Sequence, residues 1–268
     1  MRFRLAVTAL ASAVLLAGCA GPGGKGADDP GPVNPTPVNP TPVNPGPVSP
    51  STATPTGPTA GRAVSFTSAD GVALTGTLFG TGTTGVVLSN MGDNDPADWE
   101  RFAPMLSQPG YLVLTYTFRD TARSSSEMGT DSEADLAGAI AYLRKQGADD
   151  IILIGASLGG MATASLVGTD GVRAAVVLSS PVRVPGEDYA VDRQALAANT
   201  VPILYIAADA DPVVPAADTR RLYELTAGPR EWQSYPEQVH GSELLDSGSA
   251  GQVTARITGF LAEHAPIP

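Results

Sequence analysis

The sequence predicts an α/β domain built on a mostly parallel sheet of eight strands, with helices on both faces. Short apolar and β-branched runs alternate along the chain with amphipathic, helix-like segments. Clusters of glycine, aspartate and proline stand between them, as expected for turns. The region that follows residue 61 is long enough to bury one core of this kind, so we expect a single domain over residues 62–268.

Eight segments have the length and composition of strands. The first two flank the turn Ala69-Asp70-Gly71, and the later ones read as continuous apolar runs, which is typical of strands buried on both faces. They lie near residues 63–67, 72–79, 85–89, 111–116, 151–154, 172–178, 203–207 and 231–235.

Helix signals fall between these strands. Asp95 followed by Pro96 predicts a capped helix start, and Thr130 with Glu133 has the spacing of a capping box before a second helix. That second helix shows apolar residues at Leu136, Ile140 and Leu143. Another helix is expected over residues 216–225. The last helix is marked by four apolar residues, Val253, Ile257, Phe260 and Leu261. Only residues 179–200 separate the sixth and seventh strands, which predicts a minimal cap and an open site.

A candidate nucleophile stands at the end of the fifth strand. The apolar run 151–154 leads into Gly155-Ala156-Ser157-Leu158-Gly159-Gly160 and then into a helix-like stretch. Glycines two residues before and after Ser157 suit a sharp strand-to-helix turn that exposes the serine hydroxyl. The alternative is an ordinary glycine-rich turn, but the strand before the motif and the helix after it favour a nucleophile.

The chain offers only two histidines as a general base. His240 lies in the loop after the last strand and is followed by a glycine, so it can turn toward a neighbouring strand end. His264 stands near the end of the last helix, where a solvated histidine is favourable. We therefore expect His240 to be the base, against the alternative of an ordinary surface histidine.

The acid partner should lie between the serine and the histidine along the chain. The loop after the strand at 203–207 contains Asp209 and Asp211, at the carboxyl end of a parallel sheet. Either could be a turn or helix-cap aspartate. Asp209 fits that structural role better, so Asp211 is the predicted acid.

Together these residues resemble the α/β-hydrolase family, nearest to its small dienelactone-hydrolase-like serine esterases, over about residues 62–268. In that family a main-chain N–H after the nucleophile and one from the loop after the third strand bind the negatively charged oxygen of the intermediate. The resemblance therefore implies that Leu158 and Met91 form this oxyanion hole. It is also carried by Val86 to Gly92, Trp99, Gly110 to Leu114, Arg119 and Ser124.

The sequence departs from the family pattern in two loops. Asn90-Met91 stands where the family usually has His-Gly, and Thr117 with Asp120-Thr121-Ala122 replaces an Asp and a Gly-His-Gly-like turn. An asparagine amide can make some of the hydrogen bonds of a neutral imidazole, and the oxyanion donors are main-chain groups. We expect these departures to alter rate or substrate rather than abolish the chemistry.

The N-terminus predicts export and anchoring. Two arginines precede an apolar run that is too short to span a bilayer and ends in Leu16-Ala17-Gly18-Cys19. This resembles a bacterial lipobox, which implies cleavage of a signal peptide of residues 1–18 and lipid modification of Cys19. The alternative is a plain secretory signal with an incidental cysteine. Cys19 is the only cysteine of the chain, so no disulfide forms within it.

Residues 19–61 read as a disordered, proline-rich linker. Four pentapeptides follow one another over residues 31–50, each with the pattern Gly/Thr-Pro-Val-Asn/Ser-Pro. Such a chain favours the polyproline II conformation at about 3.1 Å per residue, so the linker could hold the domain on the order of 100 Å from a membrane. A ligand for a proline-binding module is the alternative.

The charge excludes some partners. The formal net charge is −11, and it becomes −13 once residues 1–18, which carry Arg2 and Arg4, are removed. Such an acidic surface argues against nucleic acid as a partner and against electrostatic docking to anionic lipid.

The sequence thus predicts a lipid-anchored, extracytoplasmic serine hydrolase of the carboxylesterase type, acting on a small-molecule ester. We expect no cofactor, no metal and a monomer. Two other functions stay open: a catalytically weak binding lipoprotein with the hydrolase fold, and a peptidase or polymer-ester hydrolase.

Overall fold

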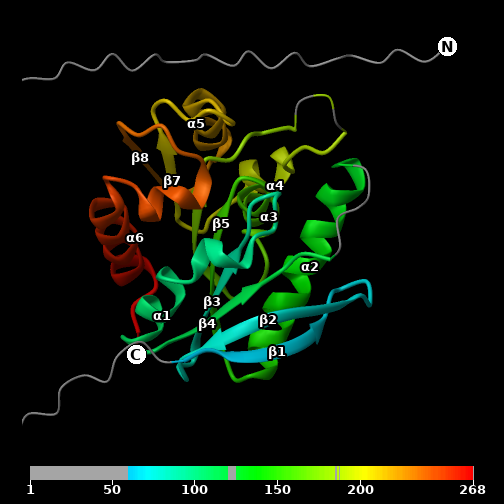
Figure 1. Cartoon of the computed structure of the whole chain (residues 1–268). Helices are drawn as coiled ribbons and strands as arrows, with labels where there is room; N and C mark the ends of the chain where they lie inside the picture. Colours follow the sequence, from blue (N-terminus) through cyan, green and yellow to red (C-terminus); the bar gives the residue numbers. More distant parts are fainter. Residues whose placement is uncertain (1–59, 120–124, 185, 187, 268) are drawn as a thin grey trace, which may run out of the picture. The chain divides into compact units, whose positions relative to one another are not determined.

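The computed structural model describes residues 60–119, 125–184, 186 and 188–267 (Figure 1). The predicted signal peptide, Cys19 and all of the linker except residues 60 and 61 lie outside this range, as do the loop residues Asp120, Thr121, Ala122 and Ser124. Within the described residues, no helix has both the length and the apolar character needed to cross a bilayer.

One sheet of eight strands organises the domain, in the order β1-β2-β4-β3-β5-β6-β7-β8. β1 pairs antiparallel with β2, and β2 pairs antiparallel with β4, whereas every other neighbouring pair is parallel. The strands are β1 Arg62–Thr67, β2 Ala73–Phe79, β3 Thr84–Ser89, β4 Tyr111–Tyr116, β5 Asp150–Ala156, β6 Val172–Leu178, β7 Ile203–Ala208 and β8 Arg230–Tyr235. The predicted strands and the mostly parallel sheet are confirmed, with shifts of one or two residues at some ends.

The central strands are apolar at nearly every position because both faces of the sheet are covered. All residues of β3 are buried, and in β5 only Asp150 is partly exposed. β8 lies at the edge of the sheet, and most of its residues are only half-buried. The burial therefore explains why the central strands read as continuous apolar runs rather than as alternating ones.

Helices cover both faces (Figure 1). The buried apolar side chains of α2, α3, α4 and α5 belong to one core cluster, and those of α1 and α6 belong to the other. The α-helices are α1 Phe102–Ser107, α2 Ser125–Lys145, α3 Leu158–Leu166, α4 Arg193–Ala198, α5 Ala216–Leu225 and α6 Ala250–His264, and two 3₁₀ turns are η1 Pro96–Trp99 and η2 Gly241–Asp246. The four apolar residues predicted to mark the last helix are all buried on α6.

Two helix starts differ from the sequence predictions. Asp95 does cap a helix, accepting a hydrogen bond from the Ala97 N–H at 2.9 Å, but that helix is the short 3₁₀ turn η1. The capping box at Thr130 is wrong, because α2 already begins at Ser125. A Thr and a Glu three residues apart are also neighbours on an uninterrupted helix, so their spacing alone does not mark a helix start.

The segment between β6 and β7 is short, as predicted. Its described residues include an isolated antiparallel bridge between Arg183 and Ala190, followed by α4. The described part of this segment is therefore a small flap rather than a large lid.

Candidate active site

Ser157 lies at a strained turn between β5 and α3. Its backbone has φ 50° and ψ −114°, and its N–H donates to Leu178 O at 2.9 Å. A side-chain-bearing residue in such a region costs about 1–3 kcal/mol, which the surrounding structure must offset. The predicted nucleophile position therefore has the backbone of a sharp strand-to-helix turn.

The glycines around Ser157 are required by close packing. A Cβ atom on Gly155 would lie 2.2 Å from the carbonyl oxygen of Gly159, and one on Gly159 would lie 2.5 Å from that of Asn90. The Gly159 N–H also donates to Asn90 O at 3.0 Å. The start of α3 is thus pressed against the end of β3, which leaves no room for side chains.

His240 and Asp211 form a hydrogen-bonded pair. His240 Nδ1 lies 2.9 Å from Asp211 Oδ2 and 3.1 Å from Oδ1. The Asp211 side chain is fully buried, and that of His240 is 11% exposed. Asp211 Oδ1 also accepts the N–H groups of Val213 and Val214, both at 2.9 Å. The carboxylate is therefore held by two main-chain donors as well as by the imidazole.

Asp209 does not make the local turn hydrogen bonds that the sequence interpretation gave it. It is exposed, its N–H donates to Tyr235 O at 2.8 Å, and its side chain has no hydrogen bond to any described residue. Asp211 makes the turn bonds itself, because the N–H groups two and three residues further on point back to it. One carboxylate thus fixes both the loop and the histidine.

The segments that carry Ser157, His240 and Met91 pack against one another. A Cβ atom on Gly241, which has φ 57°, would lie 2.4 Å from Met91 Sδ and 3.3 Å from the Ala156 Cβ. The residue after the histidine therefore touches both the residue before the serine and the loop after β3. The structure brings the three predicted segments together at the carboxyl end of the sheet.

Glu243 fixes the backbone of His240. The His240 N–H donates to Glu243 Oε2 at 2.7 Å, and the Glu243 N–H donates to His240 O at 3.1 Å. η2 starts directly after the histidine. The sequence analysis missed Glu243, because the partner of its carboxylate is a main-chain N–H, which leaves no mark on the residue types.

The loop after β3 lies beside the start of α3. Asn90 is buried, its amide nitrogen donates to Asn94 Oδ1 at 3.4 Å, and its own Oδ1 has no partner among the described residues. A Cβ atom on Gly92 would lie 4.0 Å from the Leu158 Cβ and would meet nothing nearer. Gly92 therefore lies within contact distance of Leu158, a neighbour relation that the sequence analysis did not consider.

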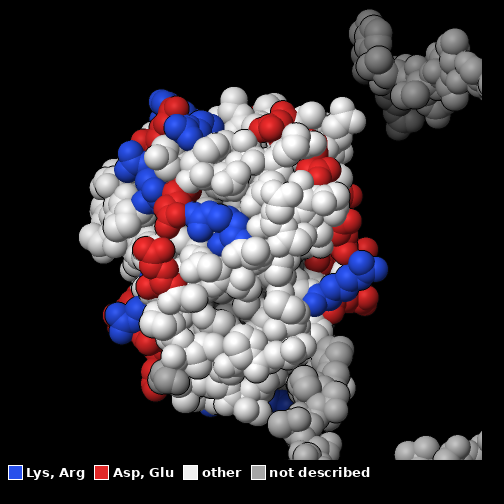
Figure 2. Space-filling view, turned by 90° about the vertical axis from the view of Figure 1, so that its left-hand side faces the viewer, with Lys and Arg blue, Asp and Glu red and all other residues white. Residues whose placement is uncertain are grey.

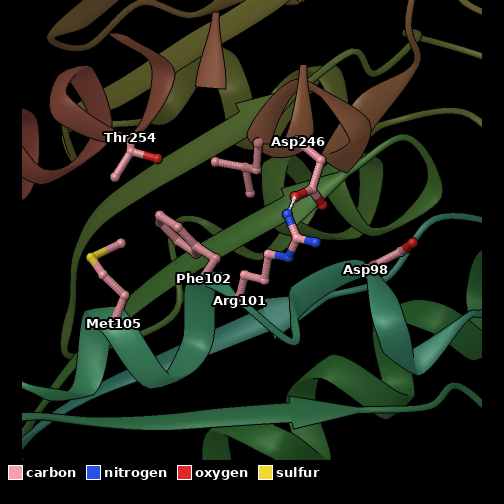
Figure 3. A pocket seen from close by; sticks show the side chains of 7 residues that line it. Asp98, Arg101, Phe102, Met105, Asp246 and Thr254 are labelled. Carbon is pink, nitrogen blue, oxygen red and sulfur yellow. Dashed lines mark hydrogen bonds and ion pairs between the residues drawn. The ribbon is translucent and has the colours of Figure 1, made fainter. Parts of the chain in front are cut away.

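Asp98 faces the N–H of Met91. Burial and the nearby charges of Asp93 and Asp95 raise the pKa of the Asp98 carboxyl to about 6, although the Met91 N–H and the Ser242 hydroxyl act in the opposite direction. Asp98 also borders a cavity of about 140 Å³ between η1-α1 and η2-α6, across which Arg101 pairs with Asp246 at 2.8 Å (Figure 3). The Asp98 carboxyl thus lies between the loop after β3 and the turn after His240, and it lines one hollow together with Ser242.

Asp98→Asn should stabilise the protein at alkaline pH. The pKa of Asp98 is about 6 in the folded state and near 3.8 in an unfolded chain, so the stability that its neutral form contributes is complete below pH 4 and lost as pH rises through 6. Asparagine stays neutral, and the gain at pH 8 should be about 1 kcal/mol after allowing for solvent screening. Thermal melts should show a Tm raised by a few degrees at pH 8 and unchanged at pH 4.

Asp209→Asn is the control for this variant, because Asp209 is exposed and is not among the charges that raise the pKa of Asp98. It should change Tm little at either pH. An equal shift for Asp98→Asn at pH 4 and pH 8 would contradict the raised pKa.

His264 is less solvated than the sequence predicted. Its Nε2 lies 3.1 Å from Glu231 Oε1, its ring contacts Phe260, and Glu231 is also paired with Arg256. Burial raises the pKa of Glu231, but hydrogen bonds from His264 and Arg256 outweigh it and hold the pKa below its usual value. His264 therefore ties α6 to the edge strand β8 and lies apart from the Ser157 region.

Glu231, Glu263 and His264 are also close enough to offer three ligand atoms to a metal ion. The guanidinium of Arg256 already neutralises Glu231, which disfavours a cation there. Seen from the side of α6, basic side chains generally border acidic ones (Figure 2).

No model of a protein family matches the chain, and no curated protein sequence matches it. Solved structures do match. The esterase Pf2001 of Pyrococcus furiosus superposes with a TM-score of 0.63 at 16% identity, over 77% of this chain and 93% of that chain. The esterase domain of a Rhodothermus marinus protein superposes with a TM-score of 0.63 at 18% identity, over 76% and 99%.

An enol-lactonase from Burkholderia xenovorans gives a TM-score of 0.62 at 16% identity, over 73% of this chain and 99% of that chain. Together with the strand order, these likenesses show that the chain has the α/β-hydrolase fold.

Proposed function

We propose that this protein is a serine hydrolase of the carboxylesterase type, tethered to the extracytoplasmic face of a bacterial membrane. The observation that carries the proposal is the combination of the strained Ser157 turn with the buried Asp211–His240 pair in an adjoining segment. A nucleophile, a base and a group that orients the base are the three parts that acyl transfer requires.

Ser157 Oγ attacks the acyl carbonyl while His240 Nε2 takes its proton. Asp211 holds Nδ1–H, which fixes the tautomer in which Nε2 is free to accept, and it stabilises the imidazolium that forms. The Leu158 N–H and an N–H of the Met91–Gly92 segment bind the oxyanion. The His240 proton then goes to the leaving alcohol, and water, activated by His240, releases the acid from the acyl-enzyme.

The substrate in this proposal is a small-molecule ester. Two of the similar structures are of an esterase and an esterase domain, and a third is of an enol-lactonase, whose substrate class also contains an acyl–oxygen bond. The short segment between β6 and β7 supports access from solvent. We keep the small dienelactone-hydrolase-like esterases as the nearest group within this proposal, and a peptidase or polymer-ester hydrolase as a variant of it.

A binding protein with weak catalysis is the second candidate. Two observations favour it: Asn90 carries an unpartnered buried amide oxygen where the family usually has histidine, and the Asp98 carboxyl faces the Met91 N–H. An ionised Asp98 competes with an oxyanion for that donor. In this case the protein would bind esters without turning them over.

Labelling with a fluorophosphonate separates the two candidates, because the probe reacts only with an activated serine. The full chain in detergent should be labelled, peptide mapping should place the adduct on Ser157, and short-chain aryl esters should be hydrolysed. Ester binding without labelling or turnover would favour the binding protein.

The location rests on the N-terminal sequence. We propose that residues 1–18 are a signal peptide, that Cys19 carries the lipid and that residues 19–61 form a proline-rich stalk before the domain at 62–268. Since Cys19 is the only lipidation site in this proposal, Cys19→Ser should block lipid attachment and signal cleavage at the lipobox. Metabolic labelling with a fatty-acid analogue and the mass of the N-terminal peptide measure both. Wild-type levels of incorporation in Cys19→Ser would refute the anchor.

A further inference from the structure

Asn94 joins the loop after β3 to the end of β4 through its side chain. Its Oδ1 accepts the Phe118 N–H at 2.8 Å, and its Nδ2 donates to Phe118 O at 3.0 Å. The side-chain amide thus pairs with the Phe118 backbone as a strand residue would. The donor and the acceptor of Phe118, just beyond the last residue of β4, are both satisfied in this way.

Phe118 is itself firmly held. The N–H of Arg119 donates to Asp135 Oδ2 at 2.8 Å, and its guanidinium binds Asp135 Oδ1 at 2.6 Å and both oxygens of Asp70 at 2.6 and 2.7 Å. Arg119 and Asp135 are buried, and the hydrogen bonds from Arg119 hold the pKa of Asp70 well below its usual range. Asn94 is therefore attached to a point that α2 and the β1–β2 turn fix from the other side.

Asn94 is also bonded to the loop after β3, which carries Met91 and Gly92. The Asn94 N–H donates to Met91 O at 3.1 Å, and Asn94 Oδ1 also receives the weaker bond from the Asn90 amide at 3.4 Å. Asn94 has φ 59°, a conformation that asparagine tolerates better than most residues. Its backbone closes the turn that contains Met91 and Gly92, while its side chain holds that turn on β4.

We infer that Asn94 is a positioning residue of the oxyanion hole. It fixes the main-chain N–H groups of Met91 and Gly92 relative to Leu158 and Ser157 without touching the substrate. This role rests on the proposed function, because it has meaning only if Ser157 forms a tetrahedral intermediate. If Asn94 had a purely structural role, its substitution would change the stability of the protein but not how tightly that intermediate is bound.

Asn94→Gly separates the side chain from the backbone. Glycine keeps the positive φ but removes both bonds to Phe118 and the contact with Asn90. Asp93→Gly is the matched control, since it adds the same backbone freedom one residue away, at an exposed position whose side chain makes no hydrogen bond to a described residue. Asn94→Asp keeps the acceptor for the Phe118 N–H and loses the donor.

The measurements are kcat and KM for a short-chain aryl ester, and Ki for a trifluoromethyl ketone, which becomes a tetrahedral oxyanion when serine adds to it. Asn94→Gly should lower kcat and raise Ki, both by about 10- to 100-fold, with KM changed by no more than about twofold. Asn94→Asp should fall between Asn94→Gly and wild type. Asp93→Gly should leave kcat and Ki near wild type, with thermal melts confirming that every variant is folded.

If the wild type is active and Asn94→Gly has the same Ki as Asp93→Gly, the role of Asn94 is overturned and the proposed function is left intact. A fall in kcat without a rise in Ki would overturn it too. If the wild-type protein is not labelled by the fluorophosphonate and does not hydrolyse the aryl ester, the proposed function is refuted, and the role of Asn94 with it. If Asn94→Gly does not fold, the ratio of Ki to KM for Asn94→Asp decides in the same way.

Discussion

Ser157→Ala should lower ester hydrolysis by about 10³-fold or more and abolish fluorophosphonate labelling. The hydroxyl is the only group lost, so the His240–Asp211 pair and the oxyanion donors persist and leave a residual rate. The measurement is kcat/KM for a short-chain aryl ester, with thermal melts at the same pH. Alanine keeps the Cβ in the strained turn, so Tm should change little.

Ser180→Ala is the control for this variant. Ser180 is a buried serine whose hydroxyl donates to Leu178 O at 3.0 Å; it lies beside Gly160 in α3 but not at the strained turn. It should stay labelled and active. Turnover of Ser157→Ala within tenfold of wild type would rule out the serine as nucleophile.

Asp211→Asn should lower kcat by up to about 10⁴-fold while the protein stays folded. The two main-chain N–H groups that now reach Asp211 Oδ1 require an oxygen there, so the asparagine must turn its NH₂ toward His240 Nδ1. Nδ1 then has to accept, which places the ring proton on Nε2. A histidine in that tautomer cannot take the proton of Ser157. Steady-state kinetics on the aryl ester measure the loss.

Asp209→Asn is the matched comparison, two residues away in the same loop. Its exposed side chain has no hydrogen bond to a described residue, so kcat should stay within about threefold of wild type. A larger loss for Asp209→Asn than for Asp211→Asn would reverse the assignment of the acid.

Strand positions followed from sequence more reliably than helix starts. The run Ile151–Ile154 lies in a parallel strand covered on both faces, so burial alone makes every residue apolar. The start of α2 depends on how far a polar segment continues as helix, and the Thr130 and Glu133 spacing does not decide this. Local patterns therefore identified the core but not the polar ends of the helices.

The candidate site was predictable where residue types are scarce or turns are special. Only two histidines had to be compared, and the glycines around Ser157 mark a turn that few sequences allow. Asn94 and Asp98 carry no such mark. Their partners, Phe118 and the Met91 N–H, are main-chain groups brought near by the fold, and main-chain partners leave no trace in the residue types.

The sheet order also governs how the chain can fold. β3 is flanked by β4 and β5, and Thr84 pairs with Asp150, so the central strand gains its second neighbour only after a long stretch of chain has been made. Closing such a loop costs entropy before any contact offsets it, which makes long-range parallel pairing slow. β5 ends next to Ser157, so the strained turn forms no earlier than this slow pairing. We therefore expect a newly made or refolding chain to acquire the Ser157 turn late, together with the β3–β5 pairing.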